Sequence, residues 1–181
     1  MSSHPMILNL FRKKQVTEAV YAIYAAIVAQ SRQPRFYADW GVPDTVTGRF
    51  DMICLHMALL FARLRREGRE VNEFAQAVFD LFFKDMDRSL REMGVTDLGV
   101  PKKIQKMGNI FYGLMTNLNE AMDKGDRAEV EAVIRRNLFD DAADAPGVAP
   151  LAAYLFEESA RLETVPTATI LGGRLDLGAA A

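Results

Sequence analysis

Length, composition and charge exclude several classes of protein. The chain has 181 residues, half of them hydrophobic and a quarter charged, which suits one globular domain and not a disordered chain. Its 22 basic and 24 acidic residues give a net charge of −2, so no overall positive field attracts nucleic acid. The single cysteine, Cys54, rules out an intramolecular disulfide. No apolar run approaches the ~20 residues that cross a bilayer, so we expect a soluble or at most peripheral protein.

The N-terminal segment, residues 1–14, places an apolar run before its positive charges. A secretory signal has the opposite order, so none is expected. Residues 6–11 with Arg12, Lys13 and Lys14 form a pattern that could touch an anionic membrane surface or pack on the core.

Helix signals dominate the rest of the chain. The expected N-caps are Thr17, either Asp44 or Thr47, and Asp126, which has the capping-box spacing to Glu129. Six helices are expected, over residues 17–32, 44–67, 72–93, 101–124, 126–139 and 150–163. The pattern predicts an all-α fold, a single compact domain of about six helices over residues 15–165, with residues 166–181 as a loosely held tail.

The helix over residues 44–67 is apolar nearly all the way round between Met52 and Leu64. A helix without a polar side belongs in the interior of a fold. We therefore expect it to be the central helix.

Asp51, Cys54 and His56 lie close together in this helix and suggest a nucleophile or a metal site. Residues two apart on a helix differ by about 200°, so Cys54 and His56 point to opposite sides, and Asp51 is a poor partner for His56. The other histidine, His4, lies in the N-terminal segment. We therefore expect no catalytic residue, no metal site and no cofactor.

A polar stripe remains on the same helix, because Arg49, His56 and Arg63 are seven residues apart. Asp80 and Asp87 have the same spacing on the next helix. One hypothesis is an internal polar seam, with His56 near Asp87 and Arg63 near Asp80. The alternative is that these charges are solvated.

Three stretches together resemble the ubiquinol–cytochrome c chaperone family: FYADWGVPDTVTGRFDMICLHMALLFARLRREG, QAVFDLFFKDMDRSLREMGVTDLGVPKKIQKMGNIFYG and IRRNLF, between residues 36 and 138. Mitochondrial members of this family are assembly factors for the cytochrome bc1 complex. The resemblance implies an all-α, non-enzymatic protein that binds cytochrome b or another bc1 subunit. Mitochondrial members also work with a small helper protein. Since no transit peptide is visible, a bacterial cytoplasmic protein at the inner face of the membrane is expected.

Carried onto this chain, the family motif divides into two sets of residues. Gly41 and Pro43 would shape a turn, Gly48 would permit a close approach, and Arg49 and Asp51 would lock the turn to the core. The full structural set is Gly41, Pro43, Asp44, Gly48, Arg49, Phe50, Asp51, His56, Asp80, Asp87, Arg91, Gly94 and Asp97. The partner-binding set is Asp85, Arg88, Lys102, Lys103, Phe79, Phe82 and Phe83.

Two other functions remain open on the residues alone. A ligand-binding protein or enzyme would have a pocket beside His56. An RNA- or ribosome-binding module would use Lys102, Lys103 and Lys106, although the even charge balance does not favour nucleic acid.

Overall fold

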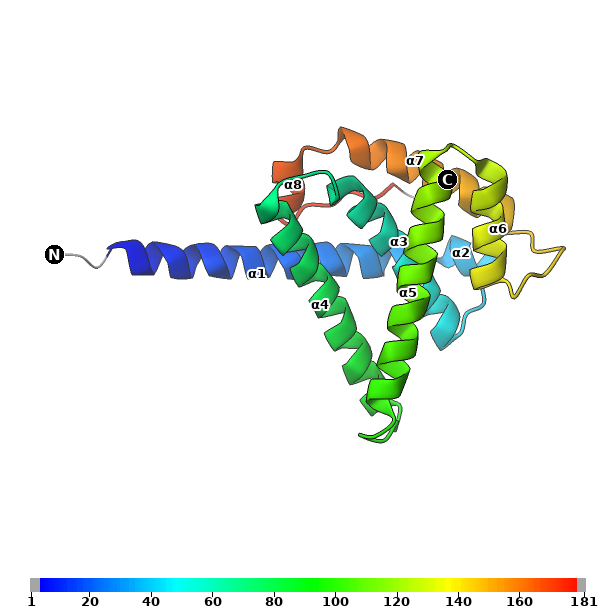
Figure 1. The fold of residues 1–181 in the computed structure, drawn as a ribbon, viewed down its shortest axis with the longest axis horizontal. Helices are drawn as coiled ribbons and strands as arrows, with labels where there is room; N and C mark the ends of the chain where they lie inside the picture. Colours follow the sequence, from blue (N-terminus) through cyan, green and yellow to red (C-terminus); the bar gives the residue numbers. More distant parts are fainter. Residues whose placement is uncertain (1–3, 179–181) are drawn as a thin grey trace.

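The computed structural model describes residues 4–178, with side chains from residue 13 onward. This part of the chain forms eight helices and no strand (Figure 1). The helices are α1 (His4–Ser31), α2 (Pro34–Ala38), α3 (Val46–Leu64), α4 (Arg69–Glu92), α5 (Val100–Asp123), α6 (Arg127–Leu138), α7 (Val148–Thr164) and α8 (Thr167–Leu171). The predicted all-α class is confirmed.

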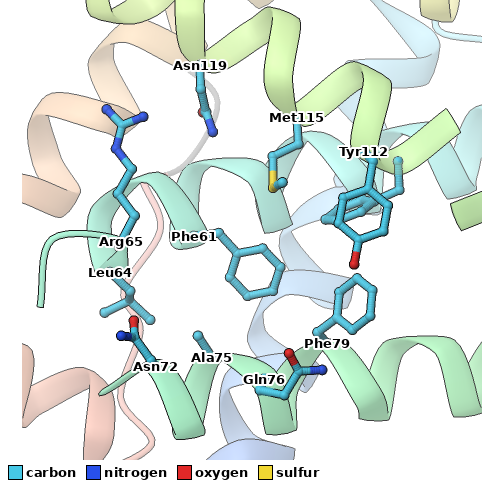
Figure 2. A pocket seen from close by; sticks show the side chains of 11 residues that line it. Phe61, Leu64, Arg65, Asn72, Ala75, Gln76, Phe79, Tyr112, Met115 and Asn119 are labelled. Atoms are coloured by element: carbon cyan, nitrogen blue, oxygen red, sulfur yellow. The ribbon is translucent and has the colours of Figure 1, made fainter. Parts of the chain in front are cut away.

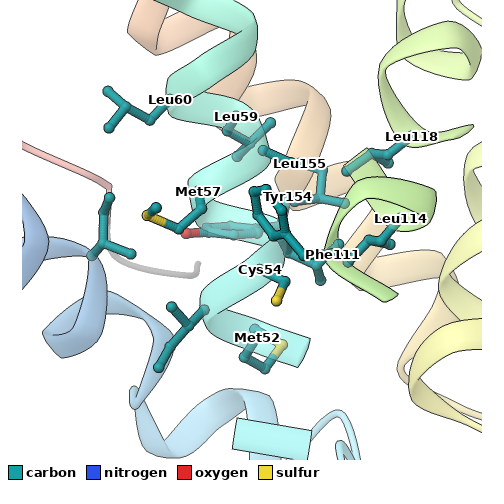
Figure 3. Packing of buried hydrophobic residues seen from close by; sticks show 14 of the residues in the cluster. Met52, Cys54, Met57, Leu59, Leu60, Phe111, Leu114, Leu118, Tyr154 and Leu155 are labelled. Carbon is teal, nitrogen blue, oxygen red and sulfur yellow. The ribbon is translucent and has the colours of Figure 1, made fainter. Parts of the chain in front are cut away.

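The centre of the fold is α3, which contacts α1, α4, α5, α6 and α7. Every residue from Phe50 to Leu60 is buried. Figure 3 shows α5 on one side of this helix, through Phe111, Leu114 and Leu118, and α7 on another, through Tyr154 and Leu155. The prediction of a central apolar helix is confirmed.

The start of α3 depends on one close approach of the backbone. Its N-cap is Thr45, not Asp44 or Thr47, and the Thr45 hydroxyl accepts a hydrogen bond from the Gly48 amide at 3.1 Å. All three residues are good N-caps, so sequence preference does not separate them. A Cβ on Gly48 would lie 2.0 Å from the carbonyl oxygen of Pro43, so only glycine fits beneath this turn.

The first helix is longer than expected. It begins at His4, and Thr17 lies inside it, where its hydroxyl donates to the Lys13 carbonyl at 2.9 Å. Thr17 is therefore not an N-cap, because the residues before it continue the helix and contain no breaker after Pro5. The side chains of residues 1–12 lie outside the described residues, and with them the expected membrane contact.

The later helices begin close to their expected positions. Pro101 lies in the first turn of α5, and the Asp126 carboxylate caps α6 by accepting from the Glu129 amide at 3.0 Å. By contrast, α4 begins at Arg69, three residues before Asn72, and α7 begins two residues before Pro150. Neither start has a side-chain cap, which is why the sequence misplaced them.

The segment after α7 is held on the core, so the expectation of a loose tail is wrong for residues 167–178. Ile170 of α8 is buried, and Leu175 and Leu177 pack against the core. The Gly178 amide donates to the Glu158 carboxylate at 3.1 Å, and the Gly178 carbonyl accepts from Gln30. The Gly- and Ala-rich composition concealed these apolar anchors.

Helices α4 and α5 form a V that projects from the body of the fold (Figure 1). The loop at its closed end turns at Gly94, whose φ of +82° favours glycine. Arg91 ties this loop to α4 by donating to Asp87 at 2.6 Å and to Asp97 at 2.5 Å. Across residues 4–178, no helix is long and apolar enough to cross a membrane.

Candidate functional site

His56 lies at the centre of a buried hydrogen-bonded network. Its Nδ1 donates to the Met52 carbonyl at 2.7 Å, because a carbonyl oxygen only accepts. Its Nε2 must then accept from the Tyr154 hydroxyl at 2.8 Å, and that hydroxyl accepts from Gln30 at 2.8 Å. Ser31 lies 3.1 Å from Nδ1. Burial lowers the pKa of His56 to about 4, so the ring is neutral at pH 7.

The hypothesis of a polar seam between α3 and α4 is wrong. His56 faces α1 and α7, and Arg63 donates to the carbonyls of Leu162 and Val165 at 3.0 and 2.9 Å. Asp80 instead accepts from Gln76, and Asp87 pairs with Arg91. The side chains of this stripe have other acceptors: Asp44 for Arg49, the Met52 carbonyl for His56, and Glu67 with the two carbonyls at the end of α7 for Arg63.

In the turn before α3, Arg49 forms a solvent-exposed ion pair with Asp44, and Asp51 takes no part in it. The Arg49 Nε donates to Asp44 at 2.7 Å, and this hydrogen bond lowers the pKa of the Asp44 carboxyl. Asp51 is 4% exposed, and within the described residues its carboxyl takes part in no hydrogen bond or ion pair. Burial, with a smaller effect from Asp140, raises the pKa of Asp51 to about 7. Asp51 is therefore a buried acid of the core.

An apolar groove lies at the open end of the V, where the C-terminal part of α3 forms its floor (Figure 2). Its volume is about 390 Å³. The apolar groove is lined by Phe61, Leu64, Arg65, Asn72, Ala75, Gln76, Phe79, Phe111, Tyr112, Met115 and Asn119. Amide side chains and one arginine therefore edge a mainly aromatic interior.

Aromatic contacts build the walls of the apolar groove. The Phe79 ring on α4 lies 5.7 Å from the Tyr112 ring and 5.7 Å from the Phe111 ring on α5. Phe61 reaches from α3 to 6.4 Å from Phe79. Tyr112 remains 52% exposed, and Met115 adds a flexible, polarisable side chain. Such a surface suits the apolar face of a helical segment.

The predicted partner-binding residues do not form one surface. Phe79 lines the apolar groove, and Phe83 is half-buried against Gly108 of α5. Phe82 is 0% exposed and stacks on Phe50 at 5.7 Å, so its predicted role in binding is wrong. The apolar pattern of α4 did not show which face α5 and α3 cover.

Asp85 and Arg88 lie in a second groove, of about 560 Å³, between α1 and α4. The Tyr24 hydroxyl donates to Asp85 at 2.8 Å, and Arg88 forms an ion pair with the same carboxylate. Tyr21 and Val28 also line this α1–α4 groove. Lys102 and Lys103 are exposed elsewhere, on the first turns of α5 at the closed end of the V.

Sequence reasoning missed most of the apolar groove. Tyr112, Met115 and Asn119 recur every three or four residues, a spacing that places them on one side of α5. Phe111 and Leu118 form the buried stripe of α5. Tyr112, Met115 and Asn119 form a second stripe on the same helix, and this second stripe could have been interpreted as a binding face.

The comparisons with known proteins agree over most of the chain. Residues 38–177 match the family model described as ubiquinol-cytochrome C chaperone. The crystal structure of the Cbp3 homolog from Brucella abortus is similar, with a TM-score of 0.86 and 37% identity over 96% of this chain and 97% of that one.

Curated animal proteins are also similar to this chain. Ubiquinol-cytochrome-c reductase complex assembly factor 1 from Xenopus laevis is 23% identical over 136 residues, which cover 75% of this chain and 68% of that protein. The human protein of the same name is also 23% identical over 75% of this chain, but the match spans only 45% of its length.

Proposed function

Because the chain belongs to the ubiquinol-cytochrome C chaperone family, we propose that it is an assembly factor for the ubiquinol-cytochrome c reductase complex and that it binds cytochrome b without catalysing a reaction. Its place would be the bacterial cytoplasm, at the inner face of the membrane. The similar proteins from Xenopus laevis and human are named as assembly factors for this complex.

The apolar groove supports binding of a hydrophobic client. Phe61, Phe79 and Met115 offer an apolar interior, while Gln76 and Asn119 at the edge can bond to polar groups of a bound segment. Binding sites with this composition gain most of their affinity from a few central aromatic side chains. The exposed Tyr112 ring is the observation that carries the proposal.

A pocket beside His56 is not part of this proposal. The ring is buried, and both of its nitrogens are engaged by Met52, Ser31 and Tyr154. The described grooves do not include it. We therefore assign His56 to the stability of the core and not to ligand binding.

The test is a tagged pulldown from the native host in mild detergent, with cytochrome b measured by mass spectrometry. Tyr112→Glu places a charge in the apolar groove, and Tyr21→Glu places the same charge on α1. The two tyrosines are matched, being 52% and 54% exposed in helices. Both variants are expected to fold, which circular dichroism would check.

Recovery of cytochrome b by the parent and by Tyr21→Glu, with at least about tenfold less from Tyr112→Glu, supports the proposal. A loss confined to Tyr21→Glu would move the client to the α1–α4 groove, which Asp85 and Arg88 line. If the parent recovers no cytochrome b, the proposed client is wrong. A small helper protein, if there is one, would be identified in the same eluates.

A further inference from the structure

The closed end of the V carries exposed apolar side chains and lysines together. Leu98 is 87% exposed and Met93 is 50% exposed, both in the loop between α4 and α5. Lys102, Lys103 and Lys106 follow on the first turns of α5, where all three are exposed. We call these five residues the tip surface. The loop between α4 and α5 lies at the projecting end of the V (Figure 1), and all five residues are exposed there.

The charge of the tip surface is not neutralised by its neighbours. Residues 84–106 contain six basic and four acidic side chains, although the whole chain has a net charge of −2. All four acids are in ion pairs with arginines, Asp85 and Glu92 with Arg88, and Asp87 and Asp97 with Arg91. Among the described residues, no ion pair involves the three lysines of the tip surface. They are therefore available to an anionic partner.

We propose that the tip surface is a membrane-contact site, which inserts Leu98 and Met93 into the interface of an anionic lipid bilayer while Lys102, Lys103 and Lys106 bind lipid phosphates. Aliphatic side chains enter the boundary between headgroups and acyl chains, and each nearby lysine adds electrostatic attraction. A projecting loop can insert its side chains into a bilayer. A protein partner would instead need a groove, either its own or one on this chain, to bind an apolar segment.

RNA is the other anionic surface that lysines could bind. Single-stranded nucleic acid is normally held by aromatic stacking as well as by charge. Residues 84–106 contain no aromatic side chain, and the most exposed large hydrophobic residue there is Leu98. The composition of the tip surface therefore favours lipid.

The tip surface is separate from the apolar groove. Along α5, Tyr112 lies ten residues after Lys102 and six after Lys106, which are ~15 Å and ~9 Å at the rise of an α-helix. Membrane contact at the tip would leave the apolar groove away from the lipid and open to a client. The inference does not rest on the identity of that client.

The experiment is flotation of the full chain with vesicles of phosphatidylcholine alone or of equal parts phosphatidylcholine and phosphatidylglycerol. The charge variant is Lys102→Gln with Lys103→Gln, and its control is Arg66→Gln with Arg136→Gln, two exposed arginines outside the described ion pairs. The apolar variant is Leu98→Ser, and its control is Val46→Ser, at a position 60% exposed on α3.

The parent is expected to bind the anionic vesicles only. The charge variant should bind them about thirtyfold more weakly, at about fivefold for each lysine. Leu98→Ser should bind about tenfold more weakly, while both controls bind as the parent does. Tyr112→Glu should also bind as the parent does, which separates this test from that of the proposed client.

A fluorophore gives a direct view of insertion. Cys54 is buried, so Leu98→Cys supplies the one reactive thiol of the folded chain. An environment-sensitive label there should shift to the blue with anionic vesicles, and a label on Val46→Cys should not. Equal binding by tip and control variants, or no preference for anionic vesicles, would overturn the inference. So would binding of single-stranded RNA, measured by anisotropy, that needs Lys102 and Lys103 in the absence of vesicle binding.

Discussion

Replacing Asp51 by asparagine is expected to stabilise the protein at neutral and alkaline pH. The carboxyl is buried in α3, and among the described residues none forms a hydrogen bond or ion pair with it. Its pKa rises from an ordinary 3.8 to about 7 because burial disfavours the charged form. Asparagine has the same shape without the charge, so it resembles the protonated acid.

The magnitude follows from this pKa. The folded protein holds the proton more tightly than the unfolded chain does, so the stabilising contribution is complete below pH 3.8 and is lost as the pH rises through about 7. At about 1.4 kcal/mol for each tenfold change in proton affinity, the ionised Asp51 costs up to ~4 kcal/mol near pH 8. Asp51→Asn should recover most of that free energy of unfolding.

His56 also makes the stability of Asp51→Asn depend on pH, in the direction opposite to the effect of Asp51. Its pKa falls from 6.5 to about 4 on burial, so its contribution is present above pH 6.5 and is lost as the pH falls through about 4. In the parent, uptake of a proton by Asp51 offsets this loss between those values. Without Asp51, stability should decline by ~3 kcal/mol over the same range. The pKa of Glu158 is also raised by burial, but equally in both proteins, so the difference between the two curves isolates Asp51.

The assay is urea unfolding at a series of pH values, followed by circular dichroism and by the fluorescence of the single tryptophan, Trp40, which is buried. Asp144→Asn, at an exposed loop position, is the control and should change stability by less than about 0.5 kcal/mol at any pH. If Asp51→Asn is less stable than the parent near pH 8, the carboxylate has a stabilising partner and the argument from burial fails.

Two further substitutions test the packing around α3, each against a matched control in urea unfolding. Gly48→Ala should destabilise by at least about 2 kcal/mol, because its Cβ would meet the Pro43 carbonyl at 2.0 Å. Gly113→Ala, with no atom within 4 Å of the new Cβ, should stabilise by about 0.5–1 kcal/mol, and equal effects of the two would refute the close approach. Tyr154→Phe should destabilise by about 1–3 kcal/mol, since His56 and Gln30 would each lose a buried partner. Tyr112→Phe should leave stability unchanged, and a neutral Tyr154→Phe would show that water replaces the hydroxyl.

Local chemistry predicted the helices that begin with a distinctive residue. Pro101 marked the start of α5, and Asp126 marked the start of α6 through its bond to the Glu129 amide. The helix start predicted at Thr17 was wrong. A threonine caps a helix only where the residues before it are not helical, and here the helix already begins at His4. Starts without a side-chain cap, as in α4, were placed three residues late.

The candidate site was predictable only in part. The sequence showed that α4 carries more phenylalanines than one face needs, but not that Phe82 is buried while Phe79 lines a groove. That division depends on where α5 packs on α4, which is set by contacts between segments distant in the chain. Tyr112 and Met115 became part of the site for the same reason.

The sequence by itself determined the all-α class, the central position of α3 and the different directions in which Cys54 and His56 point, because each follows from the angular period of a helix and from what that helix would bury. The tertiary structure decided which neighbour each stripe faces. It placed Tyr154, not Asp87, against His56, and it separated Phe79, Asp85 and Lys102 into three surfaces. The helical period gives the direction in which each side chain points from its own helix axis. The residue that it contacts depends on where a second helix packs.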